Sequence, residues 1–252
     1  MLKAILERFR QGHRTMTYPD APLPLSPRFR GLPVLDADRC QDGCRACAAA
    51  CPYGALFADG ALKLDMGKCL FCGDCAEVCP GGAVSFSNDA CLASRSREGL
   101  MVTSGEQYHP AKALEGELLR LFGRSLKLRE VSAGGCNACE ADTNVLSTIG
   151  WDLGRFGMQF VASPRHADGL FVTGPVSENM RLALLDTYAA IPEPRLVIVA
   201  GACAINGGPF KDHAEVHNGV DGLLPVDLYI PGCPPSPLTI LDGLLRLVKK
   251  VH

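Results

Sequence analysis

The chain has 252 residues, a formal net charge of −2 and 47% hydrophobic residues, enough for one large or two modest domains with a real core. This charge balance gives no reason to expect nucleic-acid binding, and no apolar run approaches the roughly 18 residues that a membrane-spanning helix needs. Because no secretory signal is evident, the 13 cysteines indicate reduced, metal-binding thiols in the cytoplasm.

Residues 1–37 are predicted to form a helix followed by an extended strap. Within residues 1–12, four apolar side chains share one helical face: Leu2, Ile5, Leu6 and Phe9. The first 30 residues carry six Lys or Arg against two acids. Such a helix either docks on a partner or at a membrane interface, or packs on its own domain. Residues 17–34 are rich in proline and are expected to be extended.

Eight cysteines in two runs mark residues 38–92 as a metal-binding domain. The runs read CQDGCRACAAACP and CLFCGDCAEVCP, each with three closely spaced thiols, a fourth after three more residues, and a proline. This spacing is typical of a bacterial two-cluster ferredoxin, in which the fourth cysteine of each run binds the other cluster. The pattern predicts one [4Fe–4S] cluster on Cys40, Cys44, Cys47 and Cys79. It predicts a second on Cys51, Cys69, Cys72 and Cys75.

Other uses of these thiols fit the spacing less well. Zinc ribbons use two separated CxxC pairs, and a disulfide framework needs an oxidising compartment. One departure from the ferredoxin pattern is the extra residue between Cys40 and Cys44, which Gly43 is expected to absorb because it tolerates unusual backbone angles. Cys91 lies outside the two runs, and a buried or idle thiol is favoured there over a ligand.

Residues 93–125 are interpreted as a linker with a connector helix. Residues 94–110 are polar and lack periodicity. Residues 111–122 carry a helical stripe, with Gly123 as a cap, formed by Leu114, Leu118, Leu121 and Phe122.

From Leu126 onward, short apolar runs alternate with helical segments. The expected strands are Leu126–Val131, Gln159–Ala162, Leu170–Thr173, Leu196–Ala200 and Leu228–Ile230. The expected helices are 140–149, 178–190 and 237–250. Ser236 should cap the last of these, with Pro237 in its first position and Lys249 and Lys250 in its final turn. Such alternation predicts a parallel sheet with helices on both faces.

Four further cysteines follow the ends of predicted strands. Cys136 and Cys139 follow the first strand, Cys203 the fourth and Cys233 the fifth. Parallel sheets build their sites at these carboxyl ends. Four thiolates converging there favour a third [4Fe–4S] cluster, with zinc as the alternative. Neighbouring glycines would let backbone amides approach the sulfurs, and a helix beginning near Glu140 would point its positive end at the cluster.

The motifs CNAC, GACAINGG and PGCPPSP, with SPRHADGLFVTGPV between them, carry a family resemblance. They resemble the small subunit of group 4 membrane-bound [NiFe] hydrogenases of formate hydrogenlyase type, and the homologous B subunit of respiratory complex I. This resemblance covers about residues 126–245. Residues 1–100 resemble the two-cluster ferredoxin subunit of the same complexes, so two subunits are fused here. The implied fold is α/β, a ferredoxin-like domain followed by a flavodoxin-like parallel-sheet domain over residues 126–252.

The resemblance implies an electron-transfer subunit of an oxidoreductase complex, with catalysis on a partner chain. The cluster on Cys136, Cys139, Cys203 and Cys233 would lie nearest a catalytic large subunit, either hydrogenase-like or like the complex I D subunit. Membrane subunits and a soluble electron donor or acceptor are further implied partners. The implied location is the cytoplasmic face of the inner membrane, where the chain would be peripheral.

Two sequence features separate the alternatives. Complex I proteins usually have adjacent cysteines where this chain reads CNAC, so the hydrogenase branch is favoured. Once the twelve cysteines above are assigned, no second CxxC pair remains for nickel, and the chain has no GxGxxG fingerprint, so the catalytic centre is expected elsewhere. The alternative is a nickel-free relative coupled to quinone or to ion pumping. A free-standing shuttle or a metal-stabilised interaction module would not need the second unit.

A few polar residues near these motifs have two interpretations each. Glu140 and Asp142 could move protons or cap their helix, and the cap is preferred. Arg165 and His166 could face the partner or brace a loop. No role is assigned to the two histidines of residues 209–222, His213 and His217.

Overall fold

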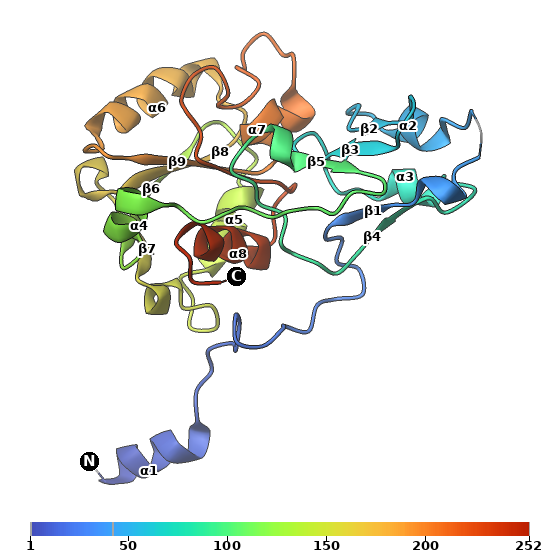
Figure 1. The fold of residues 1–252 in the computed structure, drawn as a ribbon. Helices are drawn as coiled ribbons and strands as arrows, with labels where there is room; N and C mark the ends of the chain where they lie inside the picture. The colour runs from blue at the N-terminus through green and yellow to red at the C-terminus, as the bar shows by residue number, and fades with distance from the viewer. Residues whose placement is uncertain (1, 42, 252) are drawn as a thin grey trace.

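The computed structural model describes residues 2–41 and 43–251. A five-stranded sheet forms the centre of the C-terminal unit (Figure 1). Its strands are β6 (Leu126–Ser132), β7 (Met158–Phe160), β8 (Gly169–Thr173), β9 (Leu196–Ala200) and β10 (Leu228–Ile230). They lie in the order β10-β9-β8-β6-β7, and every pair is parallel. Counted along the chain this is the order 2-1-3-4-5 of flavodoxin-like folds. The predicted α/β fold is confirmed.

Side chains alternate between the two faces of the sheet, as the two-residue period of strands requires. Val197 and Val199 of β9 enter one core, whereas Ile198 and Ala200 enter the other. The first core includes Leu184 of α6 (Glu178–Ala190) and continues into the N-terminal unit. The second core is covered by α4 (Gly116–Phe122), by α5 (Ala138–Val145), whose following residue Leu146 enters it, and by α8 (Pro237–Leu247), as Figure 1 shows.

Helix ends differ from the prediction where the backbone leaves helical geometry. Ser236 caps α8 as expected, its hydroxyl accepting a hydrogen bond from the Thr239 amide at 3.1 Å. The helix ends at Leu247, and Lys249 has a left-handed φ of 58°, so Lys249 and Lys250 lie beyond its final turn. The connector helix α4 starts at Gly116 rather than at 111, because the Leu114 amide binds the Leu247 carbonyl at 2.8 Å.

The N-terminal unit has a doubled arrangement around its two cysteine runs. Its elements are β1 (Pro33–Leu35), α2 (Ala46–Ala50), β2 (Leu56–Phe57), β3 (Lys63–Asp65), α3 (Asp74–Glu77), β4 (Val84–Phe86) and β5 (Met101–Thr103). Strands β1 and β4 pair antiparallel, as do β2 with β3 and β3 with β5. The helices α2 and α3, each carrying part of one run, contact each other. Short 3₁₀ turns lie at Ala37–Arg39, Glu98–Leu100, Leu153–Phe156, Pro164–His166 and Gly208–Phe210.

The N-terminal strap is fastened to the C-terminal unit before it reaches β1. The Met16 amide donates to the Gly150 carbonyl at 2.9 Å, and the Arg155 guanidinium donates to the Met16 and Tyr18 carbonyls at 2.8 and 2.7 Å. Tyr18 Oη donates to the buried carboxylate of Asp242 at 2.6 Å. The strap therefore joins the two units non-covalently as well as through the chain.

The thirteenth cysteine takes part in the same buried region. Arg246 donates to Asp242 at 2.8 Å and to Cys91 Sγ at 3.3 Å. Burial raises the pKa of the Cys91 thiol to about 12, and Asp242 adds to this effect. Cys91 is half-buried and its sulfur accepts a hydrogen bond within the fold. That it binds no cluster stays a prediction.

Helix α1 (Leu2–Gln11) forms as predicted, but none of its residues is buried. The interpretation that it packs on its own domain is therefore wrong. No helix among the described residues is long and apolar enough to cross a membrane.

Candidate metal centres

The predicted second cluster site is a cavity that its four thiols line. Cys51, Cys69, Cys72 and Cys75 border it, together with apolar side chains that include Leu56, Leu64 and Phe86. Burial raises the pKa of Cys69 to about 12, and Cys75, Cys51 and Cys72 oppose its ionisation further. Burial likewise raises the pKa of Cys75 to about 11, with Cys72 and Cys51 adding to it. Such thiols, which oppose one another's ionisation, are a donor set that a cationic iron core would stabilise as thiolates.

The predicted first cluster site is brought together in the same way. Burial raises the pKa of Cys47, and Cys79 and Cys40 oppose its ionisation. Cys40 and Cys44 line a cavity of about 180 Å³ beside Gly43. Gly43 has a φ of +71°, the left-handed geometry that lets a glycine accommodate the longer first loop. The extra residue itself, residue 42, lies outside the described residues.

Backbone amides point at the sulfurs in both runs. The Ala55 amide donates to Cys51 Sγ at 3.3 Å, and the Ala83 amide donates to Cys79 Sγ at 3.1 Å. Each donor lies four residues after the last cysteine of its run, so the two bonds correspond. The Phe71 amide adds a third such bond, to Cys69 Sγ at 3.3 Å. Amide bonds of this kind stabilise negative charge on a cluster's sulfurs.

The third group of thiols gathers at the carboxyl edge of the parallel sheet. Cys136 and Cys139 follow β6, Cys203 lies in the short helix α7 (Ala202–Asn206) after β9, and Cys233 follows β10. Burial raises the pKa of Cys203 to about 12, and Cys233 and Cys136 add to it. Burial also raises the pKa of Cys139, with Cys203 adding most among the charges. Cys136 and Cys233 are exposed, so this site opens to the surface.

Two glycines leave room for these thiols. A Cβ at Gly201 would lie 2.6 Å from Cys139 Sγ, and one at Gly208 would lie 2.8 Å from Cys203 Sγ. Both glycines also have left-handed φ values, of +93° and +52°. A side chain at either position would occupy the space beside a predicted ligand.

In residues 2–41 and 43–251, no three His, Cys, Asp or Glu side chains are grouped so as to hold a single metal ion. A [4Fe–4S] cluster is a larger body than one ion. The fit of the first two sites to such clusters therefore rests on their cavities, their buried thiols and the amides that donate to sulfur. The fit of the third rests on the thiols that oppose one another's ionisation and on the space that Gly201 and Gly208 leave beside them.

A cavity of about 270 Å³ lies between the second and third sites. Leu70 and Phe71 of the second cysteine run line one part, and the loop of Cys233 to Pro237 lines another. Arg28, Arg30 and Asp142 complete its polar lining. The second and third sites are therefore neighbours across the junction of the two units.

Glu140 is held beneath the third site and does not cap its helix. Its Oε1 atom accepts hydrogen bonds from Ser132 Oγ at 2.5 Å and from Thr173 Oγ1 at 2.6 Å. The preferred cap interpretation is wrong, because this carboxylate joins the ends of β6 and β8 instead. Asn137, the residue at the cap position of α5, makes no side-chain capping bond. Partial burial raises the pKa of Asp142, whose side chain borders the cavity between the sites.

Glu130 is a half-buried acid that the sequence patterns did not single out. Burial raises its pKa to about 7, and Glu140 adds to this effect. Its Oε1 atom is buried without a hydrogen-bond partner among the described residues. In the sequence of β6, Glu130 lies between Arg129 and Val131, and an acid beside a basic residue is ordinary at a strand surface.

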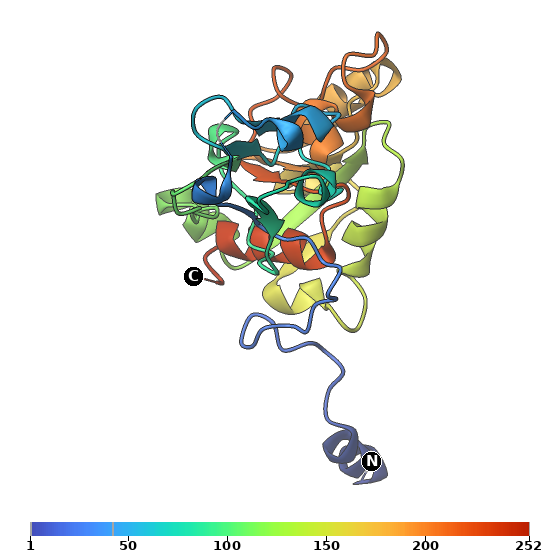
Figure 2. The same ribbon diagram turned by 90° about the vertical axis from the view of Figure 1, so that its right-hand side faces the viewer.

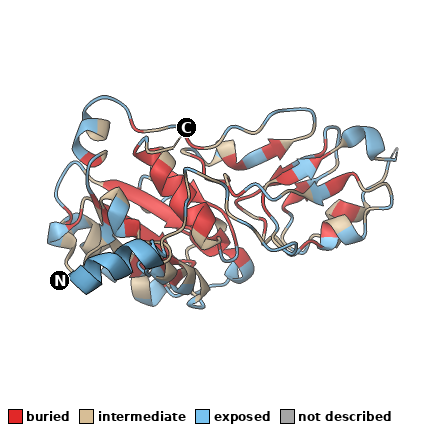
Figure 3. Ribbon diagram, turned by 90° about the horizontal axis from the view of Figure 1, so that it is seen from below, coloured by how far each residue is buried: buried red, intermediate tan, exposed pale blue. Residues whose placement is uncertain are grey.

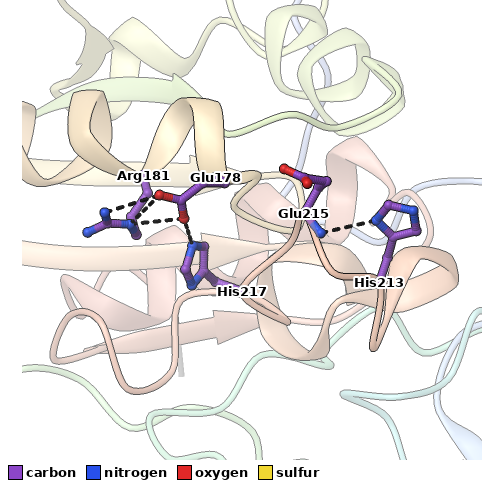
Figure 4. A network of polar contacts seen from close by, with 5 residues as sticks. All are labelled: Glu178, Arg181, His213, Glu215 and His217. Atoms are coloured by element: carbon purple, nitrogen blue, oxygen red, sulfur yellow. Dashed lines mark hydrogen bonds and ion pairs between the residues drawn. The ribbon is translucent and has the colours of Figure 1, made fainter.

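The remaining polar candidates lie away from the thiols. Arg165 and His166 precede β8 and line a cavity at the amino edge of the sheet, opposite the third site. Figure 4 shows His217, whose Nε2 lies 2.5 Å from Glu178 Oε2 at the start of α6, while Arg181 donates to the same carboxylate. His213 Nδ1 accepts from the Glu215 amide at 3.2 Å. The His217–Glu178 contact fastens the loop of residues 211–222 to α6, whereas the His213–Glu215 bond lies within the loop.

Two family models match the chain. Residues 136–247 match the NADH ubiquinone oxidoreductase, 20 Kd subunit, and residues 39–83 match the 4Fe-4S dicluster domain. Formate hydrogenlyase subunit 7 of Escherichia coli (strain K12) is 40% identical over 144 residues, 56% of this chain and 56% of that protein. The chain thus spans about half the length of that relative.

Two further relatives come from different complexes. A probable membrane-bound hydrogenase subunit, mbhJ, of Pyrococcus furiosus is 38% identical over 135 residues, 54% of this chain and 81% of that protein. The B subunit of the NADH-quinone oxidoreductase of Bacteroides thetaiotaomicron is 42% identical over 132 residues, 52% of this chain and 66% of that protein. With four fifths of the archaeal protein covered and a dicluster domain preceding the matched region, the chain belongs to the family of the NADH ubiquinone oxidoreductase 20 Kd subunit.

Proposed function

We propose that this protein is an iron–sulfur electron-transfer subunit with three [4Fe–4S] clusters, which relays electrons between a redox partner and the catalytic large subunit of a membrane-associated, [NiFe]-hydrogenase-like complex. Residues 38–92 would hold two clusters and residues 126–252 the third. One observation supports the proposal most directly: Cys233 of the third predicted group lines the same cavity as Leu70 and Phe71, which lie between Cys69 and Cys72 of the second.

The chain's own residues hold and insulate the clusters. Cys40, Cys44, Cys47 and Cys79 bind the first, Cys51, Cys69, Cys72 and Cys75 the second, and Cys136, Cys139, Cys203 and Cys233 the third. When bound, each cluster accepts and releases one electron at a time. The Ala55 and Ala83 amides stabilise sulfur charge, and apolar walls such as those of the second site exclude water.

The placement of the sites supports one order of transfer. Ionisation of Cys75 is opposed by Cys47, a thiol of the first group, so the first two groups are close. Leu70 and Phe71, which lie between Cys69 and Cys72 of the second group, line the 270 Å³ cavity together with Cys233 of the third. The third group carries the exposed thiols Cys136 and Cys233 at the carboxyl edge of the sheet. The large subunit therefore covers the third site, and a soluble donor or acceptor exchanges electrons at the first.

A second candidate function is a nickel-free complex coupled to quinone or ion pumping. The observation that favours it is the 42% identity to the B subunit of an NADH-quinone oxidoreductase. Nickel in the co-purified large subunit, with hydrogen-dependent dye reduction, would select the hydrogenase. Iron without nickel would select the alternative.

Substitution of the third site tests the proposal. In Cys136→Ala and Cys233→Ala proteins, purified anaerobically with their partners, we expect loss of one cluster, about four irons per chain. Electron transfer to the large subunit should be lost, while the reduced ferredoxin-type paramagnetic signals remain. Cys91→Ala is the matched control, because Cys91 binds Arg246 and belongs to none of the three groups. Unchanged iron and transfer in both third-site variants would overturn the assignment.

A further inference from the structure

Helix α1 stands away from the rest of the molecule, as Figures 1 and 2 show. Four large apolar side chains on it are exposed to solvent: Leu2 by 76%, Ile5 by 52%, Leu6 by 60% and Phe9 by 83%. Figure 3 shows no buried residue along α1. A contiguous apolar surface of this kind marks an interaction site.

The four apolar residues form a single stripe with basic residues on both edges. At 3.6 residues per turn, the stripe covers about 100° of the helix circumference. Lys3 and Arg10 flank one edge of the stripe, and Arg8 flanks the other. This is the pattern of a helix that lies in the plane of a membrane interface, with its apolar face in the acyl boundary and its basic side chains among the headgroups.

The charge of α1 indicates whether its partner is a lipid surface or an apolar groove on a protein. Residues 2–14 contain four basic residues against the single acid Glu7, a formal charge of +3 with His13 neutral. Since the whole chain has a formal charge of −2, the remainder carries −5. The positive charge is thus concentrated on α1 and on the three residues that follow it. We propose that α1 binds the surface of an anionic lipid bilayer and anchors this subunit there.

The connection behind α1 makes such an anchor effective. The Arg8 guanidinium donates to the Gly12 carbonyl, and Gly12 has a left-handed φ of +64°, so the helix ends there. From Gly12, four residue steps lead to Met16, whose amide is bonded to Gly150 in the C-terminal unit. Four steps span no more than roughly 14 Å. An α1 helix on the bilayer therefore keeps the C-terminal unit close to the membrane surface.

Vesicle sedimentation of the cluster-loaded full chain, with its affinity tag at the C-terminus, tests this anchor. We expect binding to phosphatidylcholine vesicles that contain phosphatidylglycerol, at least tenfold stronger than to pure phosphatidylcholine. The Ile5→Glu/Phe9→Glu variant should lose this binding. Arg8→Gln and Arg10→Gln should each weaken it, on the order of fivefold at low salt. Ile149→Glu is the matched control and should bind as wild type, because Ile149 is 78% exposed but lies elsewhere.

Two results would overturn the anchor. One is equal affinity of the wild type for both kinds of vesicle. The other is wild-type vesicle binding by Ile5→Glu/Phe9→Glu. If that variant also loses the partner subunits during purification, α1 docks on protein instead. Iron content measured on the same samples reports separately on the proposed electron-transfer function.

Discussion

At the scale of single residues, the third site depends on backbone that leaves space for sulfur. Gly201→Ala would place a methyl group 2.6 Å from the present position of Cys139 Sγ, so we predict loss of about one cluster's iron per chain. Gly222→Ala is the control, because Gly222 has a similar φ of +83° but no neighbour within 4 Å of an added Cβ. Gly201 has a φ of 93° and a ψ of 151°, a region nearly restricted to glycine, so its variant also carries backbone strain on the order of 1–3 kcal/mol. Iron content is therefore compared at equal amounts of folded protein. Equal iron content in the two proteins would contradict the steric account.

Glu130 supplies a prediction about pH. Its pKa is raised to about 7, first by burial and then by Glu140, so it should be protonated in the folded protein below neutral pH. The infrared band of a protonated carboxyl group should titrate near pH 7 and be absent in Glu130→Gln. Because the folded pKa exceeds that of the unfolded chain, stability falls as pH rises from about 4.5 to 7. The absence of any wild-type band that the substitution removes would show that Glu130 is ionised throughout.

Residue spacing predicted where the thiols gather but not how the acids beside them are held. Cys139 and Cys203 follow strand ends, and the carboxyl ends of parallel strands meet at one edge. Glu140 looked like a helix cap because it lies in the first turn of a helix. Its actual partners, Ser132 and Thr173, lie at the ends of two other strands. No local pattern brings those hydroxyls to the carboxylate.

At the scale of elements, a buried ion pair joins the ferredoxin-like unit to the segment that follows it. Arg97 binds both carboxylate oxygens of Asp65, at 2.7 Å each, and Asp65 is only 4% exposed. The Asp65 carbonyl also accepts from the Cys69 amide, at 3.1 Å. The pair therefore supports the loop that enters the second site.

Arg97→Met should lower the free energy of unfolding by about 3 kcal/mol, because it leaves the Asp65 carboxylate buried without its partner. Urea-induced loss of cluster absorbance, followed anaerobically, measures this effect. Arg120→Met is the control, since the Arg120–Glu117 pair is fully at the surface and should change stability by less than about 0.5 kcal/mol. Similar midpoints for the two variants would contradict the buried-pair account.

Some helices and strands could be predicted from the sequence with their observed bounds, and others could not. Strands β9 and β10 and helix α6 have the predicted bounds. For the two strands the reason is that their continuous apolar runs are fully buried, whereas α6 buries only Leu184. The connector helix was predicted too long. Its predicted span began at residue 111 and its apolar stripe at Leu114, but Gly116 has a φ of +55° and the preceding backbone bonds to the end of α8. The apolar Leu114 is buried as its pattern indicates, but the hydrogen bond of its amide to the Leu247 carbonyl keeps this segment out of the helix.

At the scale of the whole molecule, the two units meet where electrons would cross between them. The cavity between the second and third sites is lined by Phe71 from one unit and Cys233 from the other. The strap adds a second tie through Tyr18 and Asp242. Motif spacing predicted the two units. Their relative placement depends on such long-range contacts, which leave no local sequence pattern.

The central claim is that one chain holds three [4Fe–4S] clusters. Iron and acid-labile sulfide per chain, measured on anaerobically purified wild-type protein and supported by Mössbauer spectroscopy, test it most directly. We predict about twelve irons and twelve sulfides, all in the spectra of [4Fe–4S] clusters. About eight irons would leave the third group of cysteines without a cluster, and zinc in place of iron would contradict the account as a whole.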